Sequence, residues 1–137
     1  MRLRVVAVGR PRLAYARLGV EEYRKRIQRY APLELVFVRE EKELLPKAGG
    51  HRKVVLDERG KLLTTEELYR RLLSLEGERV AFLVGGAEGH PEAVREEADL
   101  LLSLSPLTLQ HELALLVLME QLYRVLTLRA GHPYHRP

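Results

Sequence analysis

Short apolar runs alternate with amphipathic stretches along this chain of 137 residues. Five apolar runs have the length of buried strands, at residues 3–9, 33–38, 54–57, 80–84 and 100–104. Most of the stretches between them have helical periodicity, so strands and helices alternate. This alternation predicts an α/β fold with a mainly parallel sheet and flanking helices, formed by residues 1–137 as a single domain. Ligand sites in such sheets lie beyond the carboxyl ends of the strands.

The first half of the chain is expected to hold one helix and two irregular connections. Residues 18–30 have apolar positions at helical spacing, and Pro32 ends this helix because the residue before a proline avoids helical geometry. Residues 40–50 are rich in charge and close on a glycine pair, so they are predicted to form an exposed loop. After the third apolar run, residues 58–61 are predicted to form a turn.

Two further helices are predicted from their start signals. Thr64 and Glu67 have the spacing of a capping box, which places a helix over residues 65–75. Pro91 can begin the other helix, which is expected to reach Asp99. Each of these helices lies between two consecutive strand-like runs.

The last helix is expected from Gln110 to Leu128, with Thr108 or a neighbour as its N-cap. It is apolar on nearly every side, so it should be widely buried. Its longest apolar run, residues 113–119, is too short to span a bilayer, and no membrane contact is expected. Gly131 then offers a helix stop.

Composition and charge narrow the classes of function. The chain has no cysteine, which removes disulfides, thiolate catalysis and cysteine zinc sites and agrees with a reducing compartment. No signal peptide is visible at the N-terminus, so the protein is expected in the cytoplasm. The 23 Lys and Arg residues against 19 Asp and Glu give a net charge of +4, which permits an RNA partner without requiring one.

Three loops that follow strands outline one candidate pocket. The glycine turn, residues 85–89, lets backbone approach a ligand, although a tight structural turn is its commoner meaning. Asp57 ends the third strand, where a carboxylate binds a ribose or caps a turn. Residues 104–110 form a loop of small and apolar residues whose amides and carbonyls could bracket a purine edge. Each loop alone is more often structural, but together they predict a binding site.

The C-terminal tail, residues 132–136, concentrates two imidazoles, a phenol and a guanidinium directly behind the last helix. These groups can stack on a base, donate to a phosphate or move a proton. His132 and His135 could in principle chelate a metal, but no third ligand is evident and Pro133 disfavours a helical histidine pair. No metal site is therefore expected, and the tail is a candidate for RNA contact or catalysis.

For the other three histidines we expect structural roles only. His51 lies in the connector that is predicted to be exposed. His90 follows the glycine turn, where a surface or capping role is expected. His111 is expected near the start of the last helix, where it could be a core histidine with its hydrogen bonds satisfied.

Glu120 and Arg124 lie four residues apart, so they share one face of the last helix within pairing reach. An intrahelical ion pair is the ordinary interpretation. On a helix this apolar, however, charges are costly to bury. A functional role, close to the tail, is therefore an equally strong hypothesis.

Taken together, these segments resemble the bacterial ribosomal RNA methyltransferase family of the SPOUT class that modifies N3 of a pseudouridine in large-subunit rRNA. The resemblance rests on six segments in order: Leu3-Arg4-Val5-Val6-Ala7-Val8-Gly9, Leu56-Asp57-Glu58-Arg59-Gly60-Lys61, Leu83-Val84-Gly85-Gly86-Ala87-Glu88-Gly89, Leu104-Ser105-Pro106-Leu107-Thr108-Leu109, Glu120-Gln121-Leu122-Tyr123-Arg124 and His132-Pro133-Tyr134-His135-Arg136. The ordered set is highly specific, although no single segment is. The connector over residues 40–50 is shorter than in most members, and Gln110 stands where proline is common.

The resemblance implies a C-terminal trefoil knot, a homodimer, and S-adenosylmethionine as methyl donor. In similar proteins the donor lies in the knot, which corresponds here to Leu56, Gly86, Leu104, Ser105, Pro106, Leu107, Thr108, Leu109 and Gln110. Glu120, Arg124 and the tail would then border the RNA pocket. The implied partner is large-subunit rRNA within the assembled ribosome.

The chemistry of this reaction suggests a role for each tail residue. A sulfonium methyl is already activated, so the enzyme must mainly align it with the nitrogen and ease the loss of the N3 proton. His135 is the candidate proton acceptor. Arg136 and Arg124 are candidates for holding a phosphate or a uracil carbonyl. Tyr134 is a candidate for stacking on a base, and Glu120 for orienting Arg124.

Two other functions stay open at this point. A non-catalytic ribosome-binding or RNA-binding module could use the same basic tail, and it would have no reason to bind S-adenosylmethionine. A SPOUT methyltransferase that acts on tRNA, or on another rRNA position, would bind the donor and differ only in its substrate.

Overall fold

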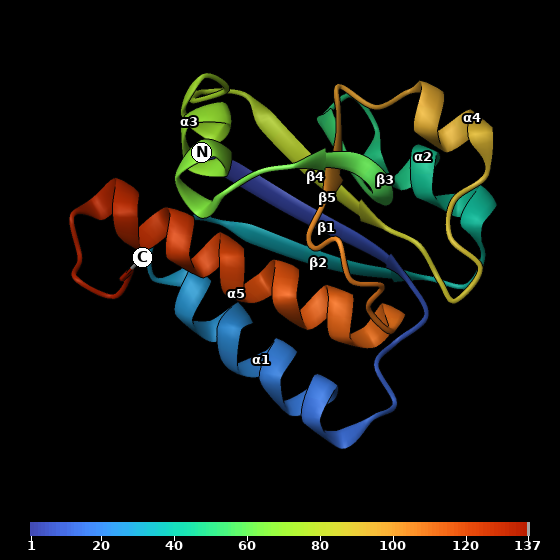
Figure 1. The fold of residues 1–137 in the computed structure, drawn as a ribbon, viewed down its shortest axis with the longest axis horizontal. Coiled ribbons are helices and arrows are strands. Elements are labelled where there is room, and N and C mark those ends of the chain that lie inside the picture. The colour runs from blue at the N-terminus through green and yellow to red at the C-terminus, as the bar shows by residue number, and fades with distance from the viewer. Residues whose placement is uncertain (137) are drawn as a thin grey trace.

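The computed structural model describes residues 1–136 of the chain. Five strands in these residues form a sheet in the order β2-β1-β4-β3-β5, and every neighbouring pair is parallel. The strands are β1 (Arg2–Val8), β2 (Leu33–Val38), β3 (Arg52–Leu62), β4 (Arg79–Val84) and β5 (Leu100–Ser103). The helices are α1 (Ala14–Gln28), the 3-10 helix η1 (Glu41–Glu43), α2 (Leu44–Ala48), α3 (Thr65–Leu73), α4 (Glu92–Glu96) and α5 (His111–Ala130). The parallel sheet with flanking helices that the sequence predicts is confirmed (Figure 1).

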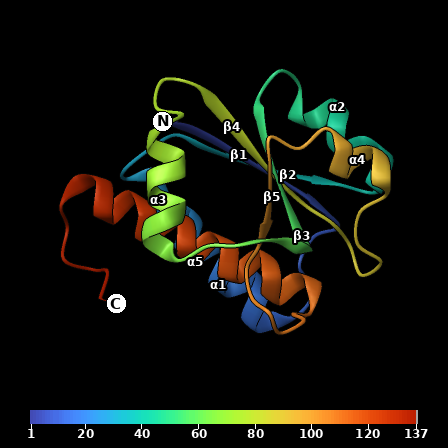
Figure 2. The same cartoon turned by 45° about the horizontal axis from the view of Figure 1, so that its top comes forward.

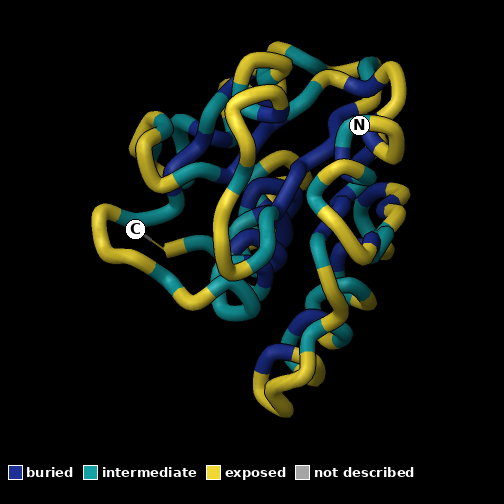
Figure 3. Tube along the Cα trace, turned by 90° about the vertical axis from the view of Figure 1, so that its right-hand side faces the viewer, coloured by how far each residue is buried: buried dark blue, intermediate teal, exposed yellow. Residues whose placement is uncertain are grey.

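Helices cover both faces of the sheet. The side chains of α1, α3 and α5 join the larger of two buried apolar clusters on one face. Those of α2 and α4 join the smaller cluster on the other face. Figure 1 shows α1 and α5 running side by side, and in Figure 3 the buried parts of the chain gather in the middle of the molecule.

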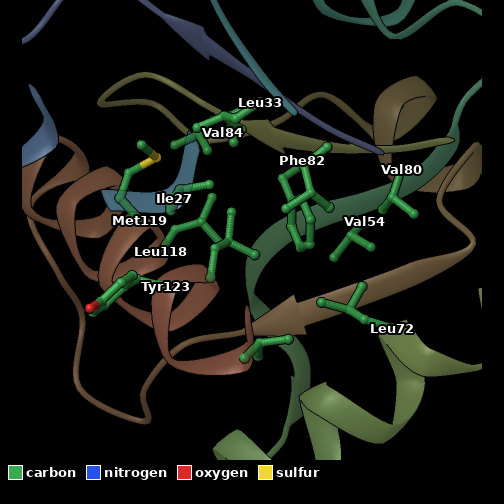
Figure 4. Close-up of a cluster of buried hydrophobic side chains, with 14 of the residues drawn as sticks. Ile27, Leu33, Val54, Leu72, Val80, Phe82, Val84, Leu118, Met119 and Tyr123 are labelled. Carbon is green, nitrogen blue, oxygen red and sulfur yellow. The ribbon is translucent and has the colours of Figure 1, made fainter. Parts of the chain in front are cut away.

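The central strands β1 and β4 are buried on both faces. Val5 and Phe82 belong to the larger cluster, whereas Val6 and Ala81 belong to the smaller one. Because side chains alternate along a strand, a strand covered on both faces needs an unbroken apolar run. Figure 4 shows Phe82 beside Val54 in the larger cluster. Burying a side chain of this size stabilises the fold by about 3 kcal/mol.

The connector over residues 40–50 is not the exposed loop that the sequence predicts. It folds into η1 and α2, and Leu44 and Ala48 are fully buried against the sheet. Their spacing of four residues puts both side chains on one face of the helix. Glu40 and Glu43 form a capping box at the start of η1. The prediction was wrong because two short helical turns give too brief a pattern to stand out among charged neighbours.

β3 continues through the residues that were predicted to form a turn. Leu102 of β5 pairs with Leu56 and again with Lys61, so the residues between them bulge out of the ladder. Gly60 lies against the backbone of the neighbouring strand, and a Cβ there would stand 2.6 Å from the carbonyl carbon of Leu101. The turn prediction was wrong because this part of β3 is held by pairing with β5, a distant segment that the local sequence pattern does not reveal.

α1 begins earlier than predicted, at Ala14. The carboxylate of Glu112 accepts hydrogen bonds from the backbone amides of Arg12, at 2.8 Å, and Leu13, at 2.9 Å. These contacts satisfy the two backbone amides that directly precede the helix. Because Glu112 belongs to α5, the sequence around residue 14 gives no sign of this cap.

The ends of α4 and α5 also differ from prediction. α4 ends at Glu96 rather than Asp99. The N-cap of α5 is Gln110, not Thr108. Its side-chain oxygen accepts hydrogen bonds from the backbone amides of Glu112, at 2.9 Å, and Leu113, at 3.0 Å. Gly131 adopts the left-handed conformation, with φ of 73°, and stops α5 as expected.

α3 begins as the capping box predicts, although it ends at Leu73 rather than Leu75. The Thr64 hydroxyl accepts from the Glu67 amide at 3.1 Å, and the Glu67 carboxylate accepts from the Thr64 amide at 2.8 Å. Thr64→Ala removes one of these acceptors, so we expect the free energy of unfolding, measured in urea, to fall by about 1 kcal/mol. Thr64→Ser keeps the hydroxyl and should lose less than about 0.5 kcal/mol. Equal losses in both variants would contradict the cap.

Candidate functional site

A pocket of about 350 Å³ lies at the carboxyl ends of β3, β4 and β5. Most of its lining comes from the glycine turn, residues 56–59, residues 102–105 and residues 107–109. The volume is within the range of small-molecule sites. The structure therefore brings together the three loops that the sequence analysis singled out, at the edge of the sheet where ligands of α/β proteins bind.

Seven of the nine residues predicted to contact a cofactor line this pocket: Leu56, Gly86, Leu104, Ser105, Leu107, Thr108 and Leu109. Pro106 and Gln110 are not among its lining residues. The Gln110 side chain caps α5. Leu107 is the most exposed of the large apolar side chains, at 74%.

The loop after β5 is held in shape by its serines. The Ser103 hydroxyl donates to the Ser105 carbonyl at 3.0 Å, and the Ser105 hydroxyl accepts from the Leu107 amide at 2.9 Å. The Thr108 hydroxyl donates to the carboxylate of Glu58 at 3.2 Å, which joins this loop to β3. The loop is thus ordered by its own polar groups on one side of the pocket.

The glycine turn forms the opposite wall. The Gly89 amide donates to the Gly86 carbonyl at 3.1 Å and closes the turn. Gly89 has φ of 77°, a conformation that side chains with a Cβ rarely adopt. A Cβ on Gly85 would lie 3.2 Å from the Gly89 backbone. Glycine is therefore required here for the shape of the turn, and the backbone itself forms the wall.

Asp57 lines the pocket, but its carboxylate is already engaged. It accepts from the Arg59 amide at 2.8 Å and forms an ion pair with Arg95 of α4 at 2.9 Å. The side chain is only 8% exposed. Of the two roles that the sequence analysis left open for Asp57, the contacts favour capping a turn.

Two histidines differ from their expected positions. His51 is buried rather than exposed, and burial, with the nearby charges of Arg4 and Arg79, lowers the pKa of its imidazole. The His90 side chain is only 2% exposed, so it does not lie on the surface. The prediction of an exposed His51 was therefore wrong. For His90 the surface role is excluded, and Glu41 from residues 40–50 lies against its ring.

Tail residues gather against the middle of α5. The Tyr134 hydroxyl donates to the Glu120 carboxylate at 3.1 Å, and Glu120 forms an ion pair with Arg124 at 2.7 Å. The Arg124 guanidinium lies over the Tyr134 ring, 4.9 Å from its centre. The ion pair that the spacing of Glu120 and Arg124 predicts is confirmed, and the structure joins it to the tail.

Tyr134 is anchored by aromatic neighbours. Its ring meets that of Tyr123 edge to face at 4.6 Å, and its hydroxyl lies 3.4 Å from that of Tyr23. Burial, the Tyr23 hydroxyl and the charge of Glu120 raise the pKa of the Tyr134 phenol. The phenol therefore stays protonated at neutral pH and acts as a hydrogen-bond donor.

Both ring nitrogens of His135 have partners. Nε2 lies 2.9 Å from the carboxylate of Glu66, and Nδ1 lies 3.3 Å from the Arg124 guanidinium. Because a guanidinium only donates, Nδ1 must accept, which places the proton on Nε2 and directs it to Glu66. The hydrogen bond with His135 lowers the pKa of Glu66. Arg136 is exposed at the end of the described chain.

Glu66 is a functional candidate that the sequence analysis did not identify. It stands in the first turn of α3, where acidic residues are common for helical reasons alone. Only the return of the tail across α5 brings His135 next to it. The sequence carried no signal that could have paired residues on α3 and the tail.

The tail and the pocket lie apart within one chain. No described tail residue lines the pocket, and Ala114 is the α5 residue that does. Glu120 lies six positions further along α5, about 9 Å along the axis and on another side of the helix. Figures 1 and 2 both show the tail and the glycine turn at opposite ends of the molecule.

The described residues contain neither a metal-binding group nor a membrane-spanning helix. Within residues 1–136, no three side chains among His, Cys, Asp and Glu are grouped so as to hold a metal ion. None of the described helices has both the length and the apolar character needed to cross a membrane.

Known proteins resemble this chain over its whole length. Residues 1–135 match a family model described as "Predicted SPOUT methyltransferase". A ribosomal RNA large subunit methyltransferase H from Thermus thermophilus is 91% identical over 137 residues, covering 100% of both chains. The protein of the same name from Deinococcus radiodurans is 46% identical over 146 aligned positions, covering 99% of each chain.

A solved structure gives the same architecture at low sequence identity. The SpoU methyltransferase AviRb from Streptomyces viridochromogenes, in complex with the cofactor AdoMet, superposes with a TM-score of 0.56 and 16% identity. The match covers 96% of this chain and 59% of that one. The fold agrees with the family model, which spans nearly all of the sequence. The chain therefore belongs to the SPOUT methyltransferase family.

Proposed function

We propose that this protein transfers a methyl group from S-adenosylmethionine to N3 of a pseudouridine in large-subunit ribosomal RNA. The observation that carries the proposal is the 91% identity, over the full length, with a protein named for methylating that RNA. The pocket at the sheet edge and the basic, aromatic tail supply the two halves of a site that such a reaction needs. The tail also explains why this activity is favoured over binding alone, because it holds a positioned imidazole.

The residues of the pocket fit S-adenosylmethionine. Leu56, Leu107 and Leu109 offer apolar surface to an adenine ring, and the glycine turn offers backbone polar groups. The acidic side chains of Glu58 and Glu88 line the same pocket, and their charge favours a positively charged ligand. When bound, S-adenosylmethionine supplies an electrophilic methyl group on its sulfonium sulfur.

We also propose the trefoil knot at the carboxyl edge of the sheet. β3 pairs with β5 on both sides of its bulge, which keeps these two segments together at the carboxyl edge of the sheet. A Cβ on Gly60 would lie 2.6 Å from the carbonyl carbon of Leu101, so the two backbones approach closely there. Such a close approach supports the proposal, because threading one segment past another needs little space between them.

His135 is the proposed acceptor of the N3 proton. Its Nε2–H is fixed on Glu66, which leaves the lone pair of Nδ1 as the basic site. The contact of Nδ1 with Arg124 is long, at 3.3 Å, and a uracil ring would replace it. Nδ1 would take the proton that N3 loses, and the carboxylate of Glu66 would stabilise the imidazolium that forms.

The remaining tail residues are proposed to hold the substrate. Arg124, once released from His135, can donate to a uracil carbonyl while Glu120 keeps its guanidinium in place. Tyr134 offers an aromatic face for a base, and the exposed Arg136 can reach a phosphate. Each role uses a group that the structure places at the tail cluster or beside it.

We propose that the working form is a homodimer. Reacting atoms must approach to about 3 Å, and the tail of one chain lies away from its own pocket. A partner subunit can place its tail over this pocket and complete the site. The net positive charge of +4 supports RNA binding by such an assembly, in the cytoplasm where ribosomes are found.

The test is transfer of a labelled methyl group to four substrates that lack the modification: ribosomes, isolated large subunits, protein-free rRNA and tRNA. We expect strong labelling of ribosomes or large subunits, with the label on N3 of a pseudouridine, and rates at least about tenfold lower on naked rRNA. A small domain reads the shape around a single base rather than a long sequence, which is the reason for this preference. Preferred labelling of tRNA would overturn the proposed substrate. So would the absence of label on all four substrates in a protein that still binds the donor.

A further inference from the structure

Glu41 of η1 reaches across to the glycine turn. One oxygen of its carboxylate accepts from the backbone amide of Gly86 at 3.1 Å. The other lies 3.2 Å from Nδ1 of His90, the residue that follows the turn. A single carboxylate therefore holds both the turn and the segment that leaves it, and it comes from a part of the chain 45 residues away.

The position of His90 is costly unless it has a function. Its side chain is 2% exposed, and within residues 1–136 its Nε2 is buried without a hydrogen-bond partner. An unsatisfied buried polar group lowers stability, and native proteins rarely keep one without a reason. His90 also lines the pocket. The burial of Nε2 thus costs stability at the place where a ligand would bind, although Glu41 satisfies the other ring nitrogen.

Gly85 shows how closely Glu41 fits the turn. A Cβ at Gly85 would stand 2.9 Å from the Glu41 carboxylate oxygen. Three glycines in five residues also make the turn flexible in the free chain, because glycine has the widest choice of backbone conformations. A contact that fixes this backbone before a ligand arrives lowers the entropy that binding must remove.

We propose that Glu41 and His90 are positioning residues, which hold the glycine turn in the shape that receives the methyl donor. This inference rests on the proposed function, since it takes the pocket to be the donor site. Glu41 acts through Gly86 and His90 and does not itself line the pocket. Its loss should therefore weaken donor binding while leaving the chemical step intact.

The test compares three variants by calorimetry with S-adenosylmethionine and by methyl-transfer kinetics. Glu41→Ala removes both contacts and should raise the Kd and KM for the donor about tenfold, with kcat at saturating donor nearly unchanged. Glu41→Gln can still accept from Gly86 and can donate to Nδ1 of His90, so it should restore affinity to within about threefold. Glu43→Ala is the matched control, because Glu43 caps η1 through the amides of Arg39 and Glu40 and does not touch the turn.

Hydrogen exchange of the Gly86 amide gives a second measurement without any ligand. We expect exchange in Glu41→Ala to be at least about tenfold faster than in the unchanged protein, and exchange in Glu43→Ala to be unaffected. If Glu43→Ala weakens donor binding as much as Glu41→Ala, the effect is general damage to η1 and the inference is wrong. If the unchanged protein does not bind S-adenosylmethionine at all, the proposed function fails first. If Glu41→Ala binds the donor as tightly as the unchanged protein does, and its Gly86 amide exchanges at the same rate, the positioning role is wrong while the proposed function stands.

Discussion

A chain that ends at Gly131 should lose methyl transfer by at least about a thousandfold, because it lacks His135, Arg136 and Tyr134 together. Donor affinity, measured by calorimetry, should stay within about threefold, since residues 132–136 do not line the pocket of their own chain and the partner's tail is proposed to hold the RNA base rather than the donor. A modest fall in melting temperature is expected, because Tyr134 packs against Tyr123. A loss of turnover with retained donor binding would show that the pocket binds the donor and that the tail serves the RNA substrate and the chemical step.

Single substitutions show whether the imidazole itself is responsible. His135→Ala should reduce turnover about a hundredfold, as expected for the loss of a general base. His132→Ala is the matched control, because it removes an imidazole from the same tail that has no proposed role, and it should keep turnover within about threefold. Full activity of His135→Ala with saturating donor would end the proton-acceptor assignment.

Co-expression tests whether the tail acts on the partner's pocket. The chain ending at Gly131 is combined with a full-length Gly86→Trp variant. Its indole is too large for the space beside Val8, 3.4 Å from where a Cβ would stand, so it should distort this wall of the pocket and prevent donor binding. Each mixed dimer then holds one intact pocket facing one intact tail, so about a quarter of normal activity should return. Recovery to no more than the sum of the separate variants would show that each chain uses its own tail.

Gly60→Ala should destabilise the fold by about 3 kcal/mol, which is large for the addition of one methyl group. The new Cβ would lie 2.6 Å from the carbonyl carbon of Leu101 and 2.8 Å from the amide nitrogen of Leu102. Both are backbone atoms of β5, which cannot move aside as a flexible side chain can. Urea denaturation measures the loss of free energy directly.

Gly50→Ala is the control for this substitution. A Cβ at Gly50 has no heavy atom within 4 Å, so the free energy of unfolding should change by less than about 0.5 kcal/mol. We also expect Gly60→Ala to weaken donor binding, because Leu102 and the loop after it line the pocket. A Gly60→Ala protein as stable as Gly50→Ala would mean that β3 and β5 are less tightly packed than the structure indicates.

The sheet was predictable from sequence because helices cover both of its faces. Residues such as Val5 and Val6 face opposite clusters, and this double burial produces the unbroken apolar runs that identify strands. The parts that were predicted wrongly failed for two reasons. η1 and α2 are too short to give a clear periodic pattern. The bulge before Lys61 and the contact of Glu112 with Leu13 depend on distant segments, which local patterns do not contain.

The candidate site was likewise predictable only where a local pattern marks it. The glycine turn and the loop after β5 were identified because each follows a strand, and the edge of a parallel sheet brings such loops together. Glu66 and Glu41 were missed because neither has a distinctive local pattern. They gained importance only when the tail returned across α5 and when η1 folded onto the sheet.

The cap on α1 links the order of folding to the order of synthesis. Glu112 accepts from the amides of Arg12 and Leu13, residues that lie 100 and 99 positions earlier in the chain. In a nascent chain these two amides, which directly precede α1, gain this acceptor only after α5 has been made and has docked beside α1. Contacts of such long sequence separation slow folding. The segment that leads into α1 is therefore among the first parts to be synthesised, yet its amides wait for one of the last helices to be made.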